Sequence, residues 1–244
     1  MYEAWLTPAF EGKGIWDGAV HSVFGRVANI ALAQGGGMRL FTLCAPDVSR
    51  LPDAARVPLD WLAHVRIGEA ARLTSTGVAV GGRTLPLVRG SWCGRIARYG
   101  GRIRAEAAAL LAPYAKRWLE QAPASIRVQA MCDLRAGDGC RWLGLGGGLT
   151  PAFDDACVGA MALRCALGDT RPFRLPPMER TTQISARYLR LAGEGYFGEP
   201  LCDAVDALFG NAPLAPALEE LAAVGATSGC DMLAGIGAML AVAG

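Results

Sequence analysis

The sequence predicts an α+β protein, in which an antiparallel β-sheet or small β-barrel precedes a mainly helical C-terminal half. Short apolar segments separated by turn residues dominate residues 1–100, whereas helical spacing of apolar residues dominates after Thr150. The glycine pair Gly100-Gly101 lies between the two patterns. Strands followed by helices are typical of α+β folds. We therefore expect a β-rich domain over 1–100 and a mainly helical domain over 101–244, or one domain that integrates both.

The predicted strands of the N-terminal part are short segments rich in Val, Leu, Ile and Phe. Gly77 and the Gly81-Gly82 pair supply turns near the end of the series. Strands spaced this closely favour an antiparallel sheet or a small barrel. Besides a short helix near Pro58–Ala63, the expected strands are Ala19–Asn29, Met38–Cys44, Val65–Ile67, Leu73–Val80 and Arg83–Val88.

The C-terminal half has the periodicity of a helical protein. Ile103–Ala122 is rich in alanine and leucine, and its internal Pro113 predicts a kinked or restarted helix. Ser125–Cys132 fits a strand or a helix equally well. Proline and glycine clusters separate the further expected helices, which are Pro151–Leu167, Thr181–Ala192, Glu199–Phe209, Ala215–Val224 and Ser228–Val242.

Composition argues against several classes of protein. The formal net charge is only +2 and no long basic stripe is present, which argues against nucleic acid as a partner. The most apolar stretch, Met232–Gly244, is shorter than the roughly 20 residues that span a bilayer, and no secretory leader is visible. The 8 cysteines form no Cys-x-x-Cys pair. We therefore expect a cytoplasmic protein with free thiols and no membrane partner.

The sharpest local feature is the glycine-rich segment Gly144–Asp155. Thr150 suits the N-cap of a helix, and Pro151 suits its first position. The preceding glycines leave backbone N–H groups unobstructed near the positive end of the helix dipole, a combination that favours phosphate or carboxylate. No lysine follows the last glycine, so the segment is not a Walker loop. The predicted anion-binding residues are Gly146, Gly147, Gly148 and Thr150.

Two adjacent carboxylates, Asp154 and Asp155, follow this loop. They would repel a bare phosphate, but they suit a Mg²⁺ ion that bridges to substrate oxygens, or a ligand with N–H donors. In the structural alternative, one carboxylate supports the helix start and the other is solvated. We favour function, because four upstream glycines are costly unless the backbone approaches a ligand. Asp154 and Asp155 are therefore candidate catalytic residues, and candidate Mg²⁺ ligands if a cation is used.

A second loop repeats the arrangement. Gly225–Asp231 matches Gly148–Asp154 at its glycine, threonine and aspartate, and each match is 77 positions apart. Two interpretations stay open: two unrelated helix caps, or two helix N-termini that converge on one polar pocket. In the second interpretation the pocket also contains Thr227, Ser228, Gly229 and Asp231.

Two further segments contain candidate polar side chains. His21–Asn29 is expected to alternate on a strand, but no neighbouring group completes a triad with its histidine, so a structural role is equally consistent. Thr181–Ser185 opens a helix with several hydroxyl groups, which ordinary capping would explain. From both segments we select one candidate catalytic residue, His21, and three candidate ligand-binding residues, Ser22, Asn29 and Thr182.

Together these motifs resemble the AllH-like family, long catalogued as a domain of unknown function. Gly144–Asp155 with the following Gly159 resembles its signature Gly-x-Gly-x-Gly-Leu-Thr-Pro-x-x-Asp-Asp. One departure is Phe153, at a position that is commonly glycine in the family, where a bulky side chain would narrow a pocket or alter its ligand. Further segments resemble family landmarks in the same order, namely His21–Asn29, Thr181–Ser185 and Gly225–Gly235.

The resemblance implies one subunit of oxamate carbamoyltransferase, an enzyme of allantoin and purine catabolism. That enzyme exchanges a carbamoyl group between oxalurate and phosphate, giving oxamate and carbamoyl phosphate. The implied partners are therefore these small anions and other subunits of the enzyme. Backbone N–H groups at a helix N-terminus suit the negatively charged centre of carbamoyl transfer. A cationic group would come from Arg26, Arg135 or Arg141, or from a partner subunit.

Two other functions stay open at this point. The first is a non-catalytic or regulatory module that binds a small anion in the same pocket. The second is a metal-dependent hydrolase that uses Asp154, Asp155 and Asp231, although no histidine lies near them in the sequence.

Overall fold

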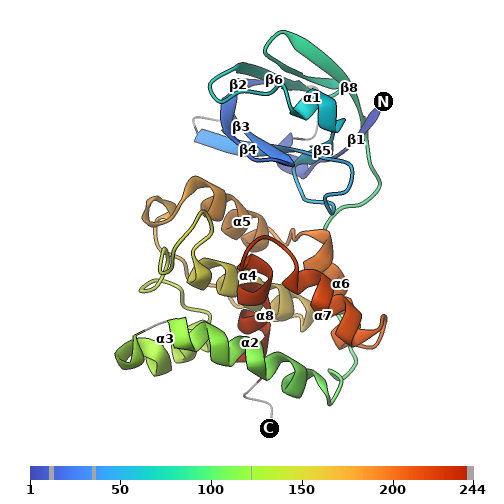
Figure 1. Cartoon of the computed structure of the whole chain (residues 1–244). Helices are drawn as coiled ribbons and strands as arrows, with labels where there is room; N and C mark the ends of the chain where they lie inside the picture. The colour runs from blue at the N-terminus through green and yellow to red at the C-terminus, as the bar shows by residue number, and fades with distance from the viewer. Residues whose placement is uncertain (11–13, 35–36, 122, 241–244) are drawn as a thin grey trace. The chain divides into compact units, whose positions relative to one another are not determined.

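The computed structural model describes residues 1–10, 14–34, 37–121 and 123–240 (Figure 1). Internal contacts divide the chain into two compact units, Met1–Gly94 and Arg95–Gly244. The first unit contains the described strands and the second is helical, so the predicted α+β class is confirmed. All eight cysteines are free thiols. Each described helix is too short or too polar to cross a bilayer.

Eight strands among the described residues form a closed barrel, so the small-barrel alternative is the one observed (Figure 1). Around the barrel their order is β1-β5-β4-β3-β2-β6-β7-β8. The barrel is mixed, because β1 pairs parallel with β8 and β4 pairs parallel with β5. The strands are β1 Tyr2–Trp5, β2 Ile15–Val23, β3 Val27–Gln34, β4 Gly37–Cys44, β5 Ala54–Arg56, β6 Ala70–Thr74, β7 Gly77–Val80 and β8 Arg83–Arg89.

Three strand predictions were wrong. Leu73–Val80 is not one strand, because residues 75 and 76 form the turn between β6 and β7. Ala19–Asn29 is not one strand but the turn region of the β2–β3 hairpin, which the Phe24 N–H closes by donating to the Val27 carbonyl at 2.7 Å. Val65–Ile67 forms a turn, although the Val65 side chain is buried, because core packing alone makes that position apolar. The sequence also missed β1 and β5, which are too short to show a period. The short helix is confirmed as α1, Leu59–Leu62.

The second unit contains seven α-helices among its described residues (Figure 1). The five helices expected after Thr150 are confirmed, although Val242, the expected end of the last one, lies outside the described residues. Pro113 lies inside one helix, so the restarted-helix alternative is wrong, and Ser125–Cys132 is helical. The helices are α2 Ala107–Gln121, α3 Ala124–Ala136, α4 Ala152–Ala166, α5 Gln183–Gly193, α6 Glu199–Leu208, α7 Leu214–Ala222 and α8 Ser228–Leu240.

Helices α4 and α8 pack directly against each other in this unit. Two glycines make their close approach possible. A Cβ atom on Gly159 would lie 2.0 Å from the carbonyl oxygen of Met232, and one on Gly235 would lie 1.9 Å from that of Ala156. Any side chain at either position would therefore force the helix backbones apart.

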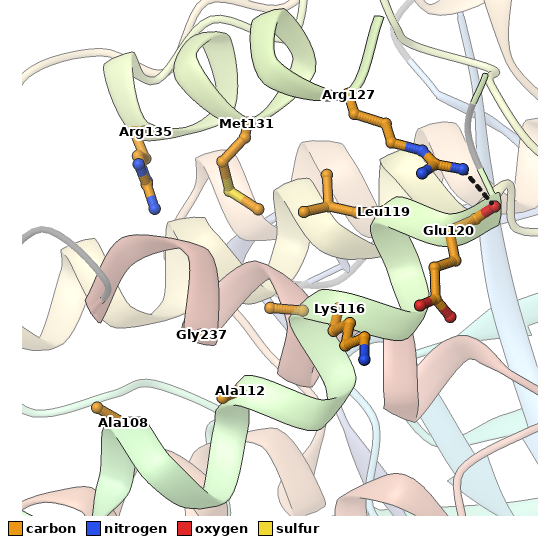
Figure 2. Close-up of a pocket in the computed structure, with 10 residues that line it drawn as sticks. Ala108, Ala112, Lys116, Leu119, Glu120, Arg127, Met131, Arg135 and Gly237 are labelled. Carbon is orange, nitrogen blue, oxygen red and sulfur yellow. Dashed lines mark hydrogen bonds between the residues drawn. The ribbon is translucent and has the colours of Figure 1, made fainter. Parts of the chain in front are cut away.

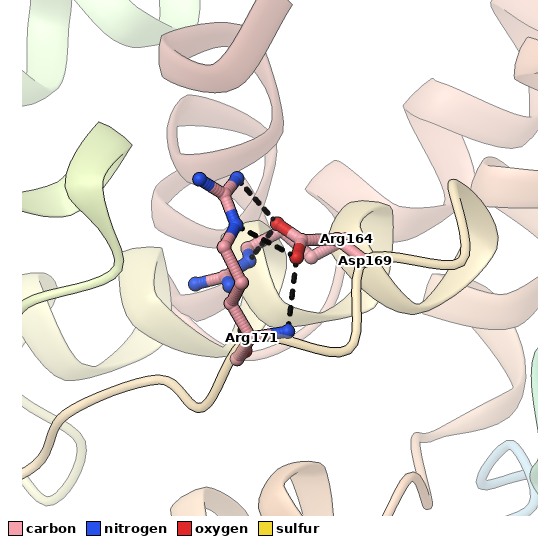
Figure 3. A network of polar contacts seen from close by, with 3 residues as sticks. All are labelled: Arg164, Asp169 and Arg171. Carbon is pink, nitrogen blue, oxygen red and sulfur yellow. Dashed lines mark hydrogen bonds and ion pairs between the residues drawn. The ribbon is translucent and has the colours of Figure 1, made fainter.

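A polar network holds the C-terminal end of α4 (Figure 3). The buried Arg164 guanidinium donates from Nε to the Asp169 carboxylate at 2.9 Å. Arg171 donates to the same carboxylate from its side chain at 2.8 Å and from its backbone N–H at 3.0 Å. Hydrogen bonds from Arg171 are the main reason why the pKa of Asp169 lies well below its ordinary value. The loop after α4 is thereby fixed to the helix that carries Asp154 and Asp155.

Candidate functional site

The N-terminal ends of α4 and α8 meet. The Thr150 hydroxyl oxygen lies 2.7 Å from that of Ser228, which is a direct hydrogen bond between the two loops that share the Gly-x-Thr-x-x-x-Asp spacing. The convergence of the two helix N-termini is therefore observed, while a polar pocket between them stays a prediction. The close crossing at Gly159 and Gly235 allows the two ends to come together.

Thr150 is not the N-cap of α4, contrary to the sequence-based expectation. The cap residue is Pro151, with φ −55° and ψ 141°, and α4 begins at Ala152. The extended ψ of the proline ends the loop one residue later than expected. The Thr150 hydroxyl bonds to Ser228 of the second loop and to the side chain of Asp155 in the first turn of α4.

Asp154 is a fully buried carboxylate with three donors. Its Oδ1 accepts from the backbone N–H of Gly144 at 2.8 Å, and its Oδ2 accepts from the Ser185 hydroxyl at 2.7 Å. The Thr181 hydroxyl also donates to Oδ2. This carboxylate joins the glycine-rich loop and the start of α5 to α4. Both of its oxygens are engaged by the protein, and its contacts are those of a residue that positions the loop.

The hydroxyl cluster at the start of α5 supplies these partners. Thr182 caps the helix, because its hydroxyl accepts from the Ser185 N–H at 3.0 Å, and it also donates to the carbonyl of Leu149 in the glycine-rich loop. Thr181 and Ser185 were not selected as candidates from the sequence. The signal in the sequence is the density of hydroxyl groups in Thr181–Ser185, which ordinary capping would also explain.

Asp155 is also buried, with 1% of its surface exposed, but its environment differs. Burial raises the pKa of its carboxyl to about 7. Hydrogen bonds from the Thr150 and Ser228 hydroxyls lower the pKa, whereas the negative charges of Asp231 and Asp154 raise it. The Oδ2 atom of Asp155 has no hydrogen-bond partner among the described residues. A buried carboxylate oxygen without a donor is costly, so this atom has an unused position for accepting a hydrogen bond.

Asp231 supplies a second carboxylate of this kind from α8. Its Oδ1 accepts from the Gln121 side chain at 3.5 Å, and its Oδ2 has no partner within the described part of the chain. Burial raises the pKa of Asp231, while hydrogen bonds from Thr227 and Gln121 and the charge of Arg117 lower it. Two acidic side chains with unpaired buried oxygens therefore lie where the two helices converge.

The stability of the protein should fall as pH rises through the titration of Asp155. A carboxyl whose pKa is raised by folding contributes stability below its unfolded pKa of about 3.9, and that contribution is lost as pH rises through about 7. The uptake of one such proton on folding changes the free energy of unfolding by about 1.4 kcal/mol per pH unit. We expect the free energy of unfolding, measured with urea at a series of pH values between these two, to fall less steeply with pH in Asp155→Asn than in the wild type. Equal slopes would contradict the raised pKa.

The glycine-rich loop in front of these carboxylates is exposed. Gly146 and Gly148 adopt positive φ values of 122° and 89°, which other residues rarely adopt. Among the described residues, the N–H groups of Gly146, Gly147 and Gly148 have no protein acceptor. Unobstructed backbone N–H groups in a glycine loop are a common cradle for phosphate and carboxylate groups.

The first N–H groups of the two helices are less available than the sequence suggested. The Phe153 N–H donates to the carbonyl of Leu145 at 3.1 Å, and the Gly229 N–H donates to that of Val224 at 3.0 Å. The loop bends back onto each helix start and satisfies these donors. Gly229 has a second structural role, because a Cβ there would lie 1.7 Å from the Leu221 carbonyl oxygen. Anion binding would therefore depend on the loop more than on the helix ends.

Phe153 is a core residue. Its ring is 1% exposed and lies 5.7 Å from the ring of Trp118 and 6.5 Å from that of Trp142, measured between centroids. Trp118 also donates from its indole nitrogen to the Ala152 carbonyl at 3.1 Å. The side chain thus packs among aromatic rings, and these contacts stabilise the first turn of α4.

The candidates from the early segment lie in the barrel unit. The Asn29 amide donates to the Ser22 hydroxyl at 3.1 Å and accepts from the Thr42 hydroxyl at 2.9 Å. The His21 Nδ1 atom lies 3.1 Å from the Ser22 hydroxyl. The strand register shifts between Val20 and Ser22, so His21 occupies a β-bulge. The three candidates therefore form one polar chain, in a different unit from Asp154 and Asp155.

The structure bears on the proposed metal and on the cationic candidates. Within the described residues, no group of three or more His, Cys, Asp or Glu side chains is arranged to hold a metal ion. Arg26 forms an ion pair with Asp47 in the barrel unit. Arg135 donates to the carbonyl of Ala238 at 2.8 Å, at the C-terminal end of α8. Arg26 and Arg135 thus each have a partner within their own unit.

These features define a class of α+β protein in which a barrel precedes a helical unit. In the helical unit the two loops Gly148–Asp154 and Gly225–Asp231, here the Thr/Asp loops, meet beside buried carboxylates. Two family models match this chain. The model described as the AllH family N-terminal domain matches residues 3–89, and the model described as oxamate carbamoyltransferase subunit AllH matches residues 142–240. The chain belongs to the AllH family. No solved structure shows a significant match to it.

Proposed function

We propose that this protein is a subunit of an oxamate carbamoyltransferase that works in allantoin catabolism, and that its exposed glycine loop binds the anionic part of a substrate. Two observations support the proposal. The N–H groups of Gly146–Gly148 have no acceptor among the described residues, and the same loop continues to Thr150, which bonds to Ser228 and to Asp155. The Oδ2 atoms of Asp155 and Asp231 have no partner among the described residues and lie where the two helices converge. The N–H groups suit a phosphate or carboxylate, and the carboxylate oxygens suit an amide NH₂. Oxamate, oxalurate and carbamoyl phosphate contain both kinds of group.

The chemistry of the step assigns a role to Asp155. A phosphate oxygen attacks the carbamoyl carbon of oxalurate, the bond from that carbon to the oxamate nitrogen breaks, and the nitrogen takes up a proton. A carboxyl with a pKa of about 7 is half protonated near neutral pH, so it is suited to donate that proton and to take one back in the reverse direction. The Thr150 and Ser228 hydroxyls that bond to Asp155 would relay it.

Partner subunits belong to this proposal. The family model that matches the helical unit is named for one subunit of an enzyme, and a carbamoyl transfer between two anions needs cationic groups. A neighbouring subunit would supply them. The free cysteines suit the reducing conditions of the cytoplasm, where we place the complex.

A charge placed in the glycine loop tests the anion site. Gly147 has no positive φ, and a Cβ atom there would meet no atom within 4 Å, so a side chain fits. We expect Gly147→Asp to weaken binding of phosphate and oxamate by about tenfold or more, because the new carboxylate repels them. The neutral, nearly isosteric Gly147→Asn is the matched control and should keep wild-type affinity. Ligand-induced shifts of the melting temperature measure both.

Two outcomes would decide against parts of the proposal. If neither phosphate, oxamate nor carbamoyl phosphate raises the melting temperature of the wild-type chain, the loop does not bind these anions. If they bind but the complex reconstituted with its partner subunits keeps full activity in Asp155→Asn, the chain is a non-catalytic binding module. The same measurements with and without Mg²⁺ test whether a cation takes part. If Asp155 binds Mg²⁺, the rise in melting temperature with each ligand should depend on the ion.

A further inference from the structure

A groove lies on the helical unit among α2, α3 and α8 (Figure 2). Its volume is about 500 Å³. Figure 2 shows the Met131 side chain of α3 pointing toward Leu119 of α2, and Gly237 of α8 also lines the groove. No residue of the groove takes part in the site formed by the Thr/Asp loops.

The wall that α2 contributes has small side chains at helical spacing. Ala108, Ala112 and Ala115 follow one another at four and three positions, so they lie on one face of the helix. Ala112 is exposed and Ala115 is half-buried, as is Leu119 one turn further on. Short side chains let another helix approach closely, and Leu119 and Met131 provide apolar surface for it to bury.

The rim of the groove is cationic. Lys116, Arg127 and Arg135 line it, and Glu120 is the only acidic side chain among the described residues that line it. Arg127 donates to the Glu120 carbonyl at 3.3 Å, and Arg135 donates to that of Ala238, so both guanidinium groups are held in place. Lys116 forms no ion pair with another described residue, and the bond from Arg135 to a neutral carbonyl leaves its positive charge uncompensated within the described part of the chain. The groove therefore favours a negatively charged occupant.

We propose that this groove binds an amphipathic helix of a partner subunit, with apolar residues against the alanine wall and Asp or Glu residues beside them. A second copy of the chain fits less well, since a symmetric contact through this face would bring two sets of the same cationic side chains together. The inference rests on the proposed function, in which the chain works with partner subunits. An apolar helix face in a groove is a common mode of recognition.

A stapled helical peptide with leucines along one face and glutamates beside them, here the acidic peptide, serves as the probe. The staple is needed because short isolated helices are marginal in water. We expect the acidic peptide to bind saturably to the full chain in fluorescence anisotropy, and the same peptide with lysines to bind at least about tenfold more weakly. Lys116→Glu should weaken the acidic peptide by about tenfold or more, and Ala112→Trp, which fills the groove, should abolish binding.

Two matched controls lie outside the groove. Ala109→Trp adds the same side chain on an exposed part of α2, and Arg190→Glu makes the same charge change at an exposed position of α5. Both should keep wild-type affinity for the acidic peptide. Equal binding of the two peptides, or wild-type affinity in Ala112→Trp, overturns the proposal. A dimer in light scattering that Ala112→Trp disrupts also overturns it, because the occupant is then a second copy.

The same variants separate this inference from the proposed function. Ala112→Trp should keep the wild-type rise in melting temperature with phosphate, because the glycine loop is intact. Loss of peptide binding with an intact phosphate response supports the groove as a separate docking site. An absent phosphate response in every variant and in the wild type refutes the anion site while the peptide results still decide the groove.

Discussion

Gly235→Ala is expected to destabilise the protein by about 3 kcal/mol, and Gly159→Ala by a similar amount. The added methyl would lie within 2.0 Å of a backbone carbonyl oxygen on the facing helix in both cases. A helix backbone cannot yield locally as a flexible side chain can, so α4 and α8 must move apart. Urea unfolding of the full chain gives the free-energy change directly.

Gly193→Ala is the control for this experiment. Gly193 also lies in a helix, but a Cβ there would have only the Met161 Cε atom near it, at 3.9 Å. Alanine is the better helix former, so this variant should be neutral or slightly more stable. If Gly235→Ala matched Gly193→Ala, the close crossing of α4 and α8 would not contribute to stability. Because the crossing brings Thr150 to Ser228, phosphate binding should also weaken in Gly235→Ala.

Asp154→Ala is expected to cost about 3 kcal/mol, through loss of the acceptor for three donors. The Ser185 hydroxyl is buried, so it cannot regain its hydrogen bond from water. Asp154→Asn should be nearly as destabilising, because an amide NH₂ would replace one accepting oxygen and face the same donors. Chemical denaturation of both variants measures the effect.

Two further variants, one at the surface and one at a hydrogen-bond donor of Asp154, make this prediction specific. Glu220→Ala removes an exposed carboxylate of α7 and should change stability by less than about 0.5 kcal/mol. Ser185→Ala removes one of the donors and should cost about 1 kcal/mol. A fully stable Asp154→Asn would show that Asp154 does not hold the loop by accepting hydrogen bonds, and would return it to the candidates for chemistry.

Local signals account for what could be predicted about the elements. The helices after Thr150 are marked by apolar periodicity and by proline and glycine at their ends, which act over a few residues. The hairpin at Phe24–Arg26 lacks such a signal, because no glycine pair or proline marks the turn, and the prediction joined its strands. Strands β1 and β5 complete the barrel through pairings with distant residues, and three or four residues cannot show a period.

The site divides in the same way. The repeated Gly-x-Thr-x-x-x-Asp spacing pointed to both loops, and their contact at Thr150 and Ser228 is observed. The roles of the two adjacent aspartates could not be separated from the sequence, because successive helix residues point in different directions into different surroundings. Asp154 meets donors from residues 144, 181 and 185, whereas Asp155 meets hydroxyls from two loops and the charge of Asp231.

By itself the sequence determined the α+β class, most of the helices, the two Thr/Asp loops and the family, because periodicity, turn residues and motif spacing are local properties of the chain. Only the tertiary structure decided the closed mixed barrel, the crossing at Gly159 and Gly235, and the raised pKa of Asp155. Burial, unpaired oxygens and interhelical contacts depend on residues far apart in the sequence, and these acquire definite neighbours only when the chain is packed.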